Sequence, residues 1–271
     1  MSTNGFHRID RTIGYTVKDI ITPTADLMCW MPEENNVDAL RTAAQADEIS
    51  FLPVKKQGKI VGVVPADCLE EKQIRPLTVD WLIAADTPIL HLITLFAENP
   101  ERVFLVLESS HIIGLVAPAD LNKLPARASL YLLTAHFEAE LAQVVRYALE
   151  DDESRLGEYL SEGRIEKLKA QRDDAGRQDM HLSLFHWLYI TDLTEIIACR
   201  EDLRDRLGFT SKGEAEKALS FRTLRNNVSH MTNLVVASRE ELKKLDDQCK
   251  RLIDYSAELK KINGAGVETI G

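Results

Sequence analysis

The chain has 271 residues, of which 45% are hydrophobic and 28% are charged, as is usual for a folded globular protein. Its formal net charge is −10. Residues 1–127 carry 12 basic and 17 acidic side chains, and residues 128–271 carry 21 and 26, so each half has a net charge of −5. This balance argues against a protein that holds nucleic acid by bulk positive charge.

The sequence also lacks several motifs that would define a class of protein. No apolar run approaches the roughly 18 residues of a membrane-spanning helix, and the first residues lack the apolar stretch of a secretion signal. The four cysteines form no CxxC pair, and there is no HExxH motif, Walker loop or set of paired zinc ligands. We therefore expect a cytoplasmic protein that contacts no membrane, has no disulfide framework and binds no metal.

The first half contains one pattern twice, over residues of about 12–72 and 73–127. Each copy includes a Thr-Val pair near its start and ends in a closely similar phrase. The phrase is IVGVVPADCL at residues 60–69 and IIGLVAPADL at residues 112–121, about 52 residues further on. A phrase that recurs in the same context indicates an internal duplication.

The two copies also predict the same order of elements: an amphipathic helix, an apolar strand, a polar hairpin turn and a second strand. These segments are residues 37–46, 51–54, 55–59 and 60–69 in the first copy, and 89–97, 103–106, 108–111 and 112–121 in the second.

The closing phrase resembles the end of a CBS motif, in which a strand carrying Gly and two apolar residues is followed by an Asp that opens a helix. The resemblance implies a CBS pair over residues 1–127 with clefts for an adenine nucleotide (AMP or ATP) or a related adenosyl compound. It also implies that Asp67 and Asp120 bind ribose hydroxyls, since a carboxylate at a helix start can accept two hydroxyl donors. The alternative is that both aspartates only cap helices.

Both copies depart from the CBS pattern at the residue three positions after the glycine. The family often has a Ser or Thr there that binds phosphate. Pro65 stands at this place in the first copy, and Ala117 stands there in the second. The clefts would therefore bind a nucleotide through the backbone, bind a nucleoside-like ligand, or bind nothing.

From residue 128 onward, apolar residues recur with a period of 3.6, which predicts an all-helical domain over residues 128–263 and a flexible tail over 264–271. A long helix is expected over residues 128–149. The fold class is thus α+β, with a CBS-pair-like α/β module followed by a helical bundle.

One helix of this second domain is predicted to begin at Ser211 and to continue past residue 230. Its apolar face would hold Phe221, Leu224, Val228, Met231 and Val235. The opposite side has no carboxylate after residue 216 and carries Arg222, Arg225, Asn226, Ser229, His230 and Asn233. Such a composition suits the binding of an anion.

The run RNNVSH at residues 225–230 matches the R-x4-H motif of HEPN domains, many of which are metal-independent endoribonucleases that act as dimers. The resemblance implies an RNA substrate whose 2′-hydroxyl is the nucleophile. In that role Arg225 would hold the phosphate, Asn226 would orient the ring or a phosphate oxygen, and His230 would act as general acid or base.

On an unbroken helix, Arg225 and His230 would lie about 140° apart. A shallow cleft, a distortion of the helix near residues 226–227, or a composite site made by two chains would bring them to one substrate. The plain structural alternative is that Arg222 and Arg225 pair with acidic stretches at residues 150–153 or 173–174, and that His230 is a satisfied structural histidine.

The sequence thus predicts a ligand-regulated, metal-independent endoribonuclease with a composite site in a homodimer. The alternative is a non-catalytic adenine-nucleotide sensor whose helical domain serves for dimerisation or partner docking. A third possibility is a structural front module, with the nuclease restrained by a separate partner protein.

Overall fold

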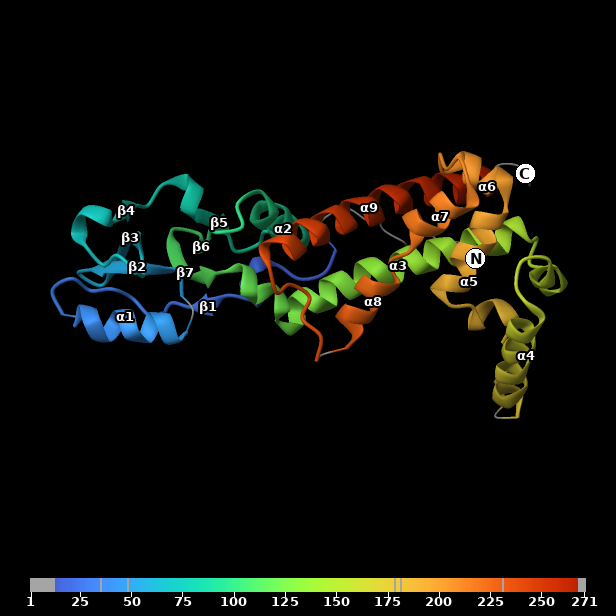
Figure 1. Cartoon of the computed structure of the whole chain (residues 1–271), viewed down its shortest axis with the longest axis horizontal. Coiled ribbons are helices and arrows are strands. Elements are labelled where there is room, and N and C mark those ends of the chain that lie inside the picture. The colour runs from blue at the N-terminus through green and yellow to red at the C-terminus, as the bar shows by residue number, and fades with distance from the viewer. Residues whose placement is uncertain are drawn as a thin grey trace. The chain divides into compact units, whose positions relative to one another are not determined.

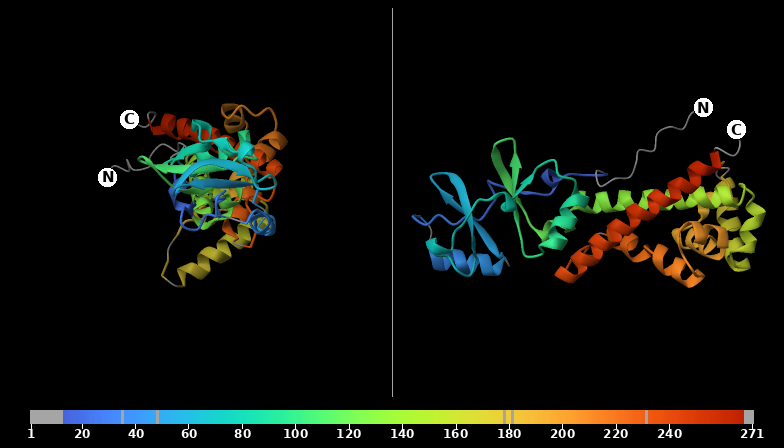
Figure 2. Two further views of the ribbon diagram at one scale, coloured as in Figure 1. Left: turned by 90° about the vertical axis from the view of Figure 1, so that its left-hand side faces the viewer. Right: turned by 90° about the horizontal axis from the view of Figure 1, so that it is seen from above.

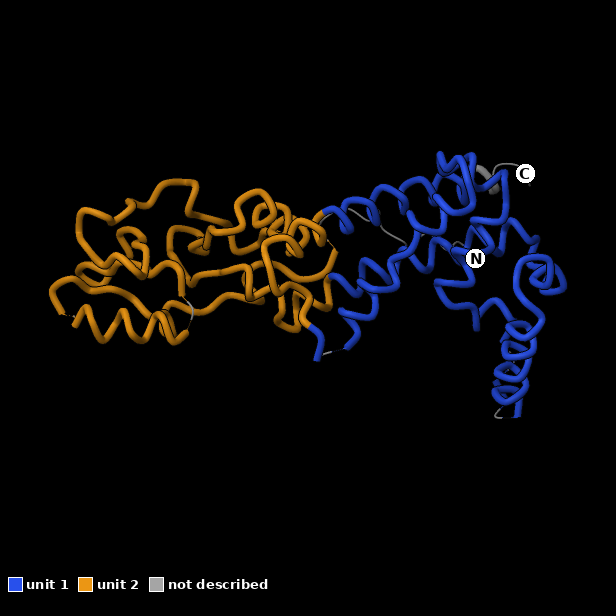
Figure 3. The backbone as a smooth tube through the Cα atoms, viewed as in Figure 1, with its two compact units in different colours: residues 1–10, 130–233, 247–271 blue, residues 11–129, 234–246 orange. Residues whose placement is uncertain are grey.

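The computed structural model describes residues 13–267 apart from residues 35, 48, 178, 181 and 231. The chain forms two compact units (Figure 3). Among the described residues, the repeat unit comprises those within 13–129 and 234–246, and the helical unit comprises those within 130–233 and 247–267. The sequence predicted one boundary after residue 127, whereas the structure adds a second, later segment to the repeat unit.

That later segment is tied to the repeat unit by hydrogen bonds. The side-chain oxygen of Asn122 accepts from the backbone N–H groups of Val235 and Val236 at 2.8 and 3.2 Å, and its amide donates to the Val236 carbonyl at 2.8 Å. Thr94 also donates to the buried Asp246 carboxylate at 2.7 Å. Side-chain contacts of this kind, far apart in sequence, leave no periodic pattern from which they could be predicted.

The repeat unit contains two sheets (Figure 1). One has the strand order β2 (Phe51–Lys56), β3 (Lys59–Pro65), β4 (Arg75–Pro76), and the other has the order β1 (Thr22–Pro23), β7 (His111–Val116), β6 (Phe104–Glu108), β5 (Leu82–Ala84). Strand β4 belongs to the second copy and pairs with β3 of the first, while β1 belongs to the first copy and pairs with β7 of the second. Each copy therefore gives its first strand to the other.

The glycine of each closing phrase lies where the exchanged strand crosses. Gly62 is opposite Pro76, and Gly114 is opposite Pro23. A Cβ atom at either glycine would lie closer than 3.0 Å to a backbone carbonyl oxygen of the exchanged strand. The close approach of two backbones is therefore what requires glycine at both places.

One helix from each copy packs against these sheets, as predicted. Helix α1 (Val37–Ala46) begins at Asn36, whose side chain accepts from two backbone N–H groups of the first turn. It lies along β2 and β3 (Figures 1 and 2), where Ala44 joins a core cluster with Leu52 and Val64. Helix α2 (Ile89–Glu98) is buried on most of its surface.

Short 3₁₀ helices complete the repeat unit, namely η1 (Val17–Asp19), η2 (Glu71–Gln73), η3 (Val79–Trp81) and η4 (Pro118–Asn122). Asp120 lies within η4, but the chain forms only a turn at Asp67. The predicted helix at Asp67 is therefore absent. The first phrase has one residue fewer between its glycine and its aspartate, and Pro65 lies at the end of β3. In the second phrase, Pro118 occupies the first position of η4, where its missing N–H costs nothing.

The helical unit contains most of α3 (Leu124–Ala148) and of α9 (Arg239–Val267), together with the elements between them. These are η5 (Glu153–Glu158), α4 (Glu162–Gly176), η6 (Leu184–Trp187), α5 (Ile190–Cys199), α6 (Glu201–Arg206), α7 (Lys212–Leu219) and α8 (Arg222–Ser229). The long helix expected over residues 128–149 is confirmed by α3. The tail predicted from residue 264 is still helical to Val267, and residues 268–271 lie outside the described part of the chain.

The single helix predicted from Ser211 past residue 230 is wrong. Ser211 does cap its start, but α7 ends at Leu219, and α8 runs only from Arg222 to Ser229. Leu219 and Phe221 are both almost fully buried, and residues two apart face different sides of a helix. The break at residues 220–221 lets both enter the core, where Phe221 packs edge-on against Phe137 at 5.2 Å.

Among the helices of the described residues, none combines the length and the apolar character required to cross a membrane.

Candidate functional site

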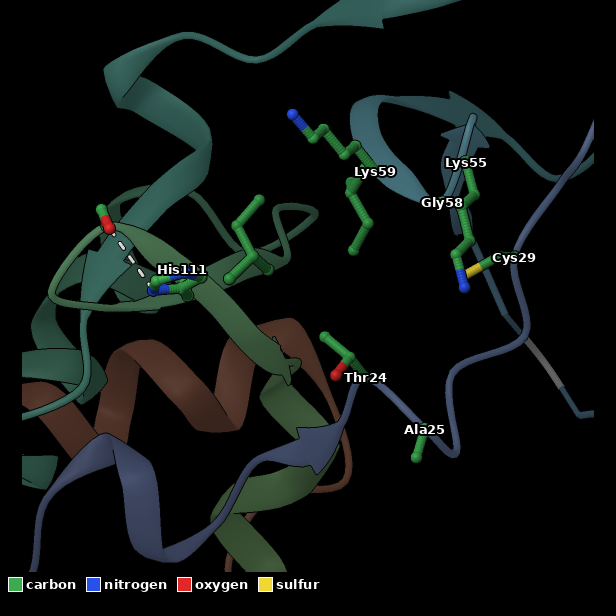
Figure 4. Close-up of a pocket in the computed structure, with 10 residues that line it drawn as sticks. Thr24, Ala25, Cys29, Lys55, Gly58, Lys59 and His111 are labelled. Atoms are coloured by element: carbon green, nitrogen blue, oxygen red, sulfur yellow. Dashed lines mark hydrogen bonds between the residues drawn. The ribbon is translucent and has the colours of Figure 1, made fainter.

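The repeat unit has a cavity of about 610 Å³ at the hairpin turns of its two sheets (Figure 4). The turn between β2 and β3 and the turn between β6 and β7 both line it. The lining residues are Thr24, Ala25, Cys29, Lys55, Gly58, Lys59, Ile60, Ser110, His111 and Ile112. Lys59 and His111 immediately precede the two repeated phrases, which begin at Ile60 and Ile112, so matching positions of both copies meet here.

Local backbone geometry sets the position of these side chains. Each turn closes between paired residues, Lys56 with Lys59 and Glu108 with His111, and both turns contain a non-glycine residue with positive φ. Each hairpin also has a register shift at the same place, beside Val54 in one and Val106 in the other. Because a bulge bends and twists its strand, the shared irregularity gives the two hairpin ends the same form.

The lining of this cavity is basic. Lys55, Lys59 and His111 contribute to it, and none of the ten lining residues is an aspartate or glutamate. Within the described part of the chain, neither Lys55 nor Lys59 forms a salt bridge, whereas the neighbouring Lys56 pairs with Glu71 at 2.9 Å. The two lysine charges are therefore available to a bound anion.

Figure 4 shows Lys55 beside Cys29 on one side of the cavity and His111 on the other. Burial raises the pKa of the Cys29 thiol, and the nearby charge of Lys55 lowers it by less. The thiol is therefore in its neutral form at physiological pH. The Nδ1 atom of His111 lies 3.3 Å from the hydroxyl of its neighbour Ser110.

Neither aspartate of the repeated phrases lines this cavity. In Asp120, one carboxylate oxygen accepts from the Ala117 N–H at 2.7 Å, and the other pairs with Lys123 at 2.8 Å. Asp120 thus caps η4, which agrees with the alternative interpretation of the sequence, in which the aspartates cap helices. Asp67 is exposed in the turn after β3.

The sequence interpretation treated residues 55–59 and 108–111 only as turns and so missed the lysines and the histidine. One signal was available, because the turn KKQGK at residues 55–59 holds three lysines and no acidic residue. Its relation to His111 depends on how the two hairpins meet in space, which the sequence does not reveal.

The helical unit brings two of its three predicted catalytic residues together. Arg225 and Asn226 line a cavity of about 300 Å³ with Arg222, because positions i, i+3 and i+4 of α8 lie on one face. Among the described residues, neither arginine forms a salt bridge, and the carboxylates at residues 150, 151 and 153 pair with other arginines. The predicted alternative pairing with the stretch at 150–153 is thus not observed.

His230 is not part of this cavity lining. The residue follows the last turn of α8 with extended backbone angles, and its N–H donates to the Asn226 carbonyl at 3.0 Å. This cavity therefore brings Arg225 together with Asn226 but does not include His230. Among the described residues, no cluster of His, Cys, Asp or Glu has the makings of a metal site.

No protein-family model matches the chain, and no curated protein matches it significantly. Several solved structures of CBS-domain proteins are similar to part of it. CBSX2 in complex with AMP is 22% identical and matches 44% of this chain and 98% of its own, with a TM-score of 0.35. CBSX2 from Arabidopsis thaliana is 21% identical, matching 44% of this chain and 96% of its own, with the same TM-score.

The CBS domain of a bacterial CNNM/CorC family Mg²⁺ transporter in complex with ATP is 20% identical, covering 40% of this chain and 84% of its own, with a TM-score of 0.32. At such identities and TM-scores, these similarities assign no ligand to this chain. A ligand therefore has to be inferred from the side chains that line the cavities of this chain.

Proposed function

We propose that the repeat unit is a CBS-like module that binds an adenine nucleotide such as AMP or ATP in the cavity between its hairpins. The proposal rests on the lining of this cavity, which includes Lys55, Lys59 and His111 and contains no carboxylate. Lysine donors would take the place of the Ser or Thr hydroxyl that both phrases lack. Hydrogen bonds to charged groups contribute about 1.5–3 kcal/mol each, enough for a phosphate to prefer this cavity to solvent.

Calorimetry with ATP, AMP, adenosine and inorganic phosphate tests the proposal. We expect affinity to fall from ATP to AMP to adenosine, because the lysines contact phosphate. The double variant Lys55→Gln with Lys59→Gln should lose at least tenfold in ATP affinity. Lys72→Gln is the matched control, since Lys72 is an exposed lysine of the same unit that pairs with Glu70 and lies outside the cavity.

Equal affinity of the double variant and the control would contradict this site. If Asp67→Asn or Asp120→Asn reduced binding instead, the ligand would lie in clefts at the repeated phrases, as the CBS resemblance implied.

A second candidate function, metal-independent cleavage of RNA, is favoured by two arginines of α8 beside Asn226, neither of which forms a salt bridge with another described residue. The 2′-oxygen would attack phosphorus while the bond to the 5′-oxygen breaks, leaving a 2′,3′-cyclic phosphate and a 5′-hydroxyl. One group accepts the 2′-hydroxyl proton, another gives a proton to the leaving oxygen, and Arg225 stabilises the charge on the phosphorane. His230 would act across a homodimer, in a composite site with Arg225 of a second copy.

Incubation of the protein with labelled single-stranded RNA in EDTA tests this function, with and without AMP, ATP or S-adenosylmethionine. Cleavage that survives EDTA and disappears in His230→Ala would support it, and a nucleotide effect would show regulation. Such regulation requires that the ligand bind the active and inactive states with different affinities. Cleavage unchanged in the variant would remove His230 from the mechanism.

A further inference from the structure

The cavity at α8 continues along the helical unit as a groove. A second cavity of about 300 Å³ shares Ile190, Thr191 and Arg222 with the first. The groove therefore runs between the N-terminal end of α5 and one face of α8. Two features of its lining, the aromatic ring of Tyr189 and the side chain of Arg222, lie outside the motif at residues 225–230.

The aromatic ring is that of Tyr189, which lines the groove, is 52% exposed and yet is held in place. The guanidinium of Arg164 lies 4.8 Å from the ring centroid. Arg164 is itself fixed by hydrogen bonds to both carboxylate oxygens of Asp192, at 2.9 and 2.7 Å, and these bonds raise its pKa. Asp192 also accepts the Tyr189 backbone N–H at 2.7 Å.

This arrangement leaves a preorganised aromatic surface beside the groove. A ring that is already fixed loses little conformational entropy when a planar ligand stacks on it. The charges of Arg164 and Asp192 offset each other, so the local charge of the groove comes from other residues.

Those residues are Arg222 and Arg225, one helical turn apart on α8 in the first cavity, together with the carboxylates Glu195 and Glu216 in the second. Within the described residues neither arginine forms a salt bridge. Glu138 is the carboxylate that lines the first cavity, and it forms no ion pair with either arginine. The first N–H groups of α5, which have no acceptor within their own helix, add partial positive charge at this end of the groove.

We propose that this groove binds a single-stranded nucleic acid, with one base stacked on Tyr189 and an adjacent phosphate held between Arg222 and Arg225. The inference rests on the second proposed function for the class of ligand, and it adds contacts outside Arg225, Asn226 and His230. Base stacking on a fixed aromatic ring and pairing of phosphate with arginine are the two components of single-strand binding. A local site of this kind is compatible with the net negative charge of the whole chain.

Fluorescence anisotropy with matched ten-nucleotide single strands of RNA and DNA tests the inference. The full chain carries His230→Ala so that the RNA stays intact, and the buffer contains EDTA. Tyr189→Ala should weaken binding roughly 5- to 150-fold, as expected for the loss of one stacked base. Tyr189→Phe should retain affinity, because it keeps the ring.

The arginine variants have a different expected result. Each phosphate contact contributes about −0.7 to the slope of log affinity against log salt for a single strand. Arg222→Gln or Arg225→Gln should make the slope about 0.7 less negative, whereas Tyr189→Ala should leave it unchanged. Glu138→Gln should tighten binding about two- to fivefold, since it removes a repulsive charge.

Arg206→Gln is the matched control. Arg206 is an exposed arginine of the same unit that lines no part of the groove. Its substitution should leave both affinity and slope unchanged. Thermal melts of all variants show whether a loss of affinity reflects unfolding.

Tyr189→Ala that stays folded and binds as tightly as the parent would overturn the inference, as would arginine variants with an unchanged salt slope. The outcome is separable from that of the ribonuclease proposal. If binding depends on Tyr189 but the wild-type chain cleaves no RNA, the proposed binding groove stands and the proposed ribonuclease activity does not. If RNA is cleaved equally well by the Tyr189→Ala variant, the ribonuclease proposal stands and the proposed binding groove does not.

Discussion

The two copies of the repeat use their common glycine in the same way and their common aspartate in different ways. Gly62 and Gly114 are each paired with a residue of the strand that the other copy supplies. Asp120, in contrast, caps a 3₁₀ helix and pairs with Lys123, while Asp67 is exposed in a turn. The duplicated phrase therefore preserves the backbone crossing, whereas the environment of the aspartate depends on a single additional residue.

The start of each copy shows a similar divergence. The side chain of Asp19 accepts hydrogen bonds from the N–H and hydroxyl of Thr16. The corresponding 3₁₀ helix of the second copy, after Thr78, ends at Trp81, which packs edge-on against Phe51 at 5.6 Å. A polar cap in one copy is thus replaced by an aromatic contact in the other, with the same local backbone.

The largest effect is expected where the copies are alike. Gly62→Ala and Gly114→Ala should each lower the free energy of unfolding by about 1–3 kcal/mol, because the new Cβ would collide with a carbonyl of the exchanged strand. Urea denaturation monitored by circular dichroism measures the change.

The control for these variants has the opposite expected sign. Gly163 lies in α4 with no atom within 4 Å of the position of a Cβ. Gly163→Ala should stabilise the protein by about 0.4–1 kcal/mol, because alanine fits this position without strain and has less conformational freedom in the unfolded chain. If Gly62 tolerated alanine and Gly114 did not, the two strand crossings would not be equivalent.

An intermediate effect is expected at the cavity, where Lys59 and His111 occupy matching positions. Lys59→Glu and His111→Glu should each weaken ATP binding by tenfold or more, about 1.4 kcal/mol, because each places a carboxylate against phosphate. The exchange variant with Lys59→His and His111→Lys should retain affinity to within about threefold. Calorimetry compares the three.

Should the exchange variant lose as much affinity as the glutamate variants, the two positions would not be interchangeable around one ligand. The side chain from one copy would then contribute more to ligand binding than the side chain from the other.

How far the sequence predicted these features depends on the kind of interaction that determines each one. The duplication, α1, α2 and α3 follow from local patterns, since a repeated phrase or a 3.6-residue period survives in the sequence. The break between α7 and α8 does not, because it arises from the burial of both Leu219 and Phe221 in one core. The Tyr189 surface likewise depends on Arg164, 25 residues earlier in the chain.

The smallest effect is expected at the aspartates, and it tests the difference between the copies most directly. Asp120→Asn should cost about 1 kcal/mol, because it weakens the cap on η4 and removes the charge that pairs with Lys123. Lys123 also donates to the Ile20 carbonyl at 2.7 Å, so Asp120 helps to hold the segment that leads into β1. Asp67→Asn, at an exposed turn, should change stability by less than about 0.5 kcal/mol. Equal losses in the two variants, measured by urea denaturation, would mean that Asp67 has a structural role like that of Asp120. Unequal losses of the expected size would show that the aspartate stabilises the fold in the second copy and not in the first, although the rest of the phrase is nearly the same in both.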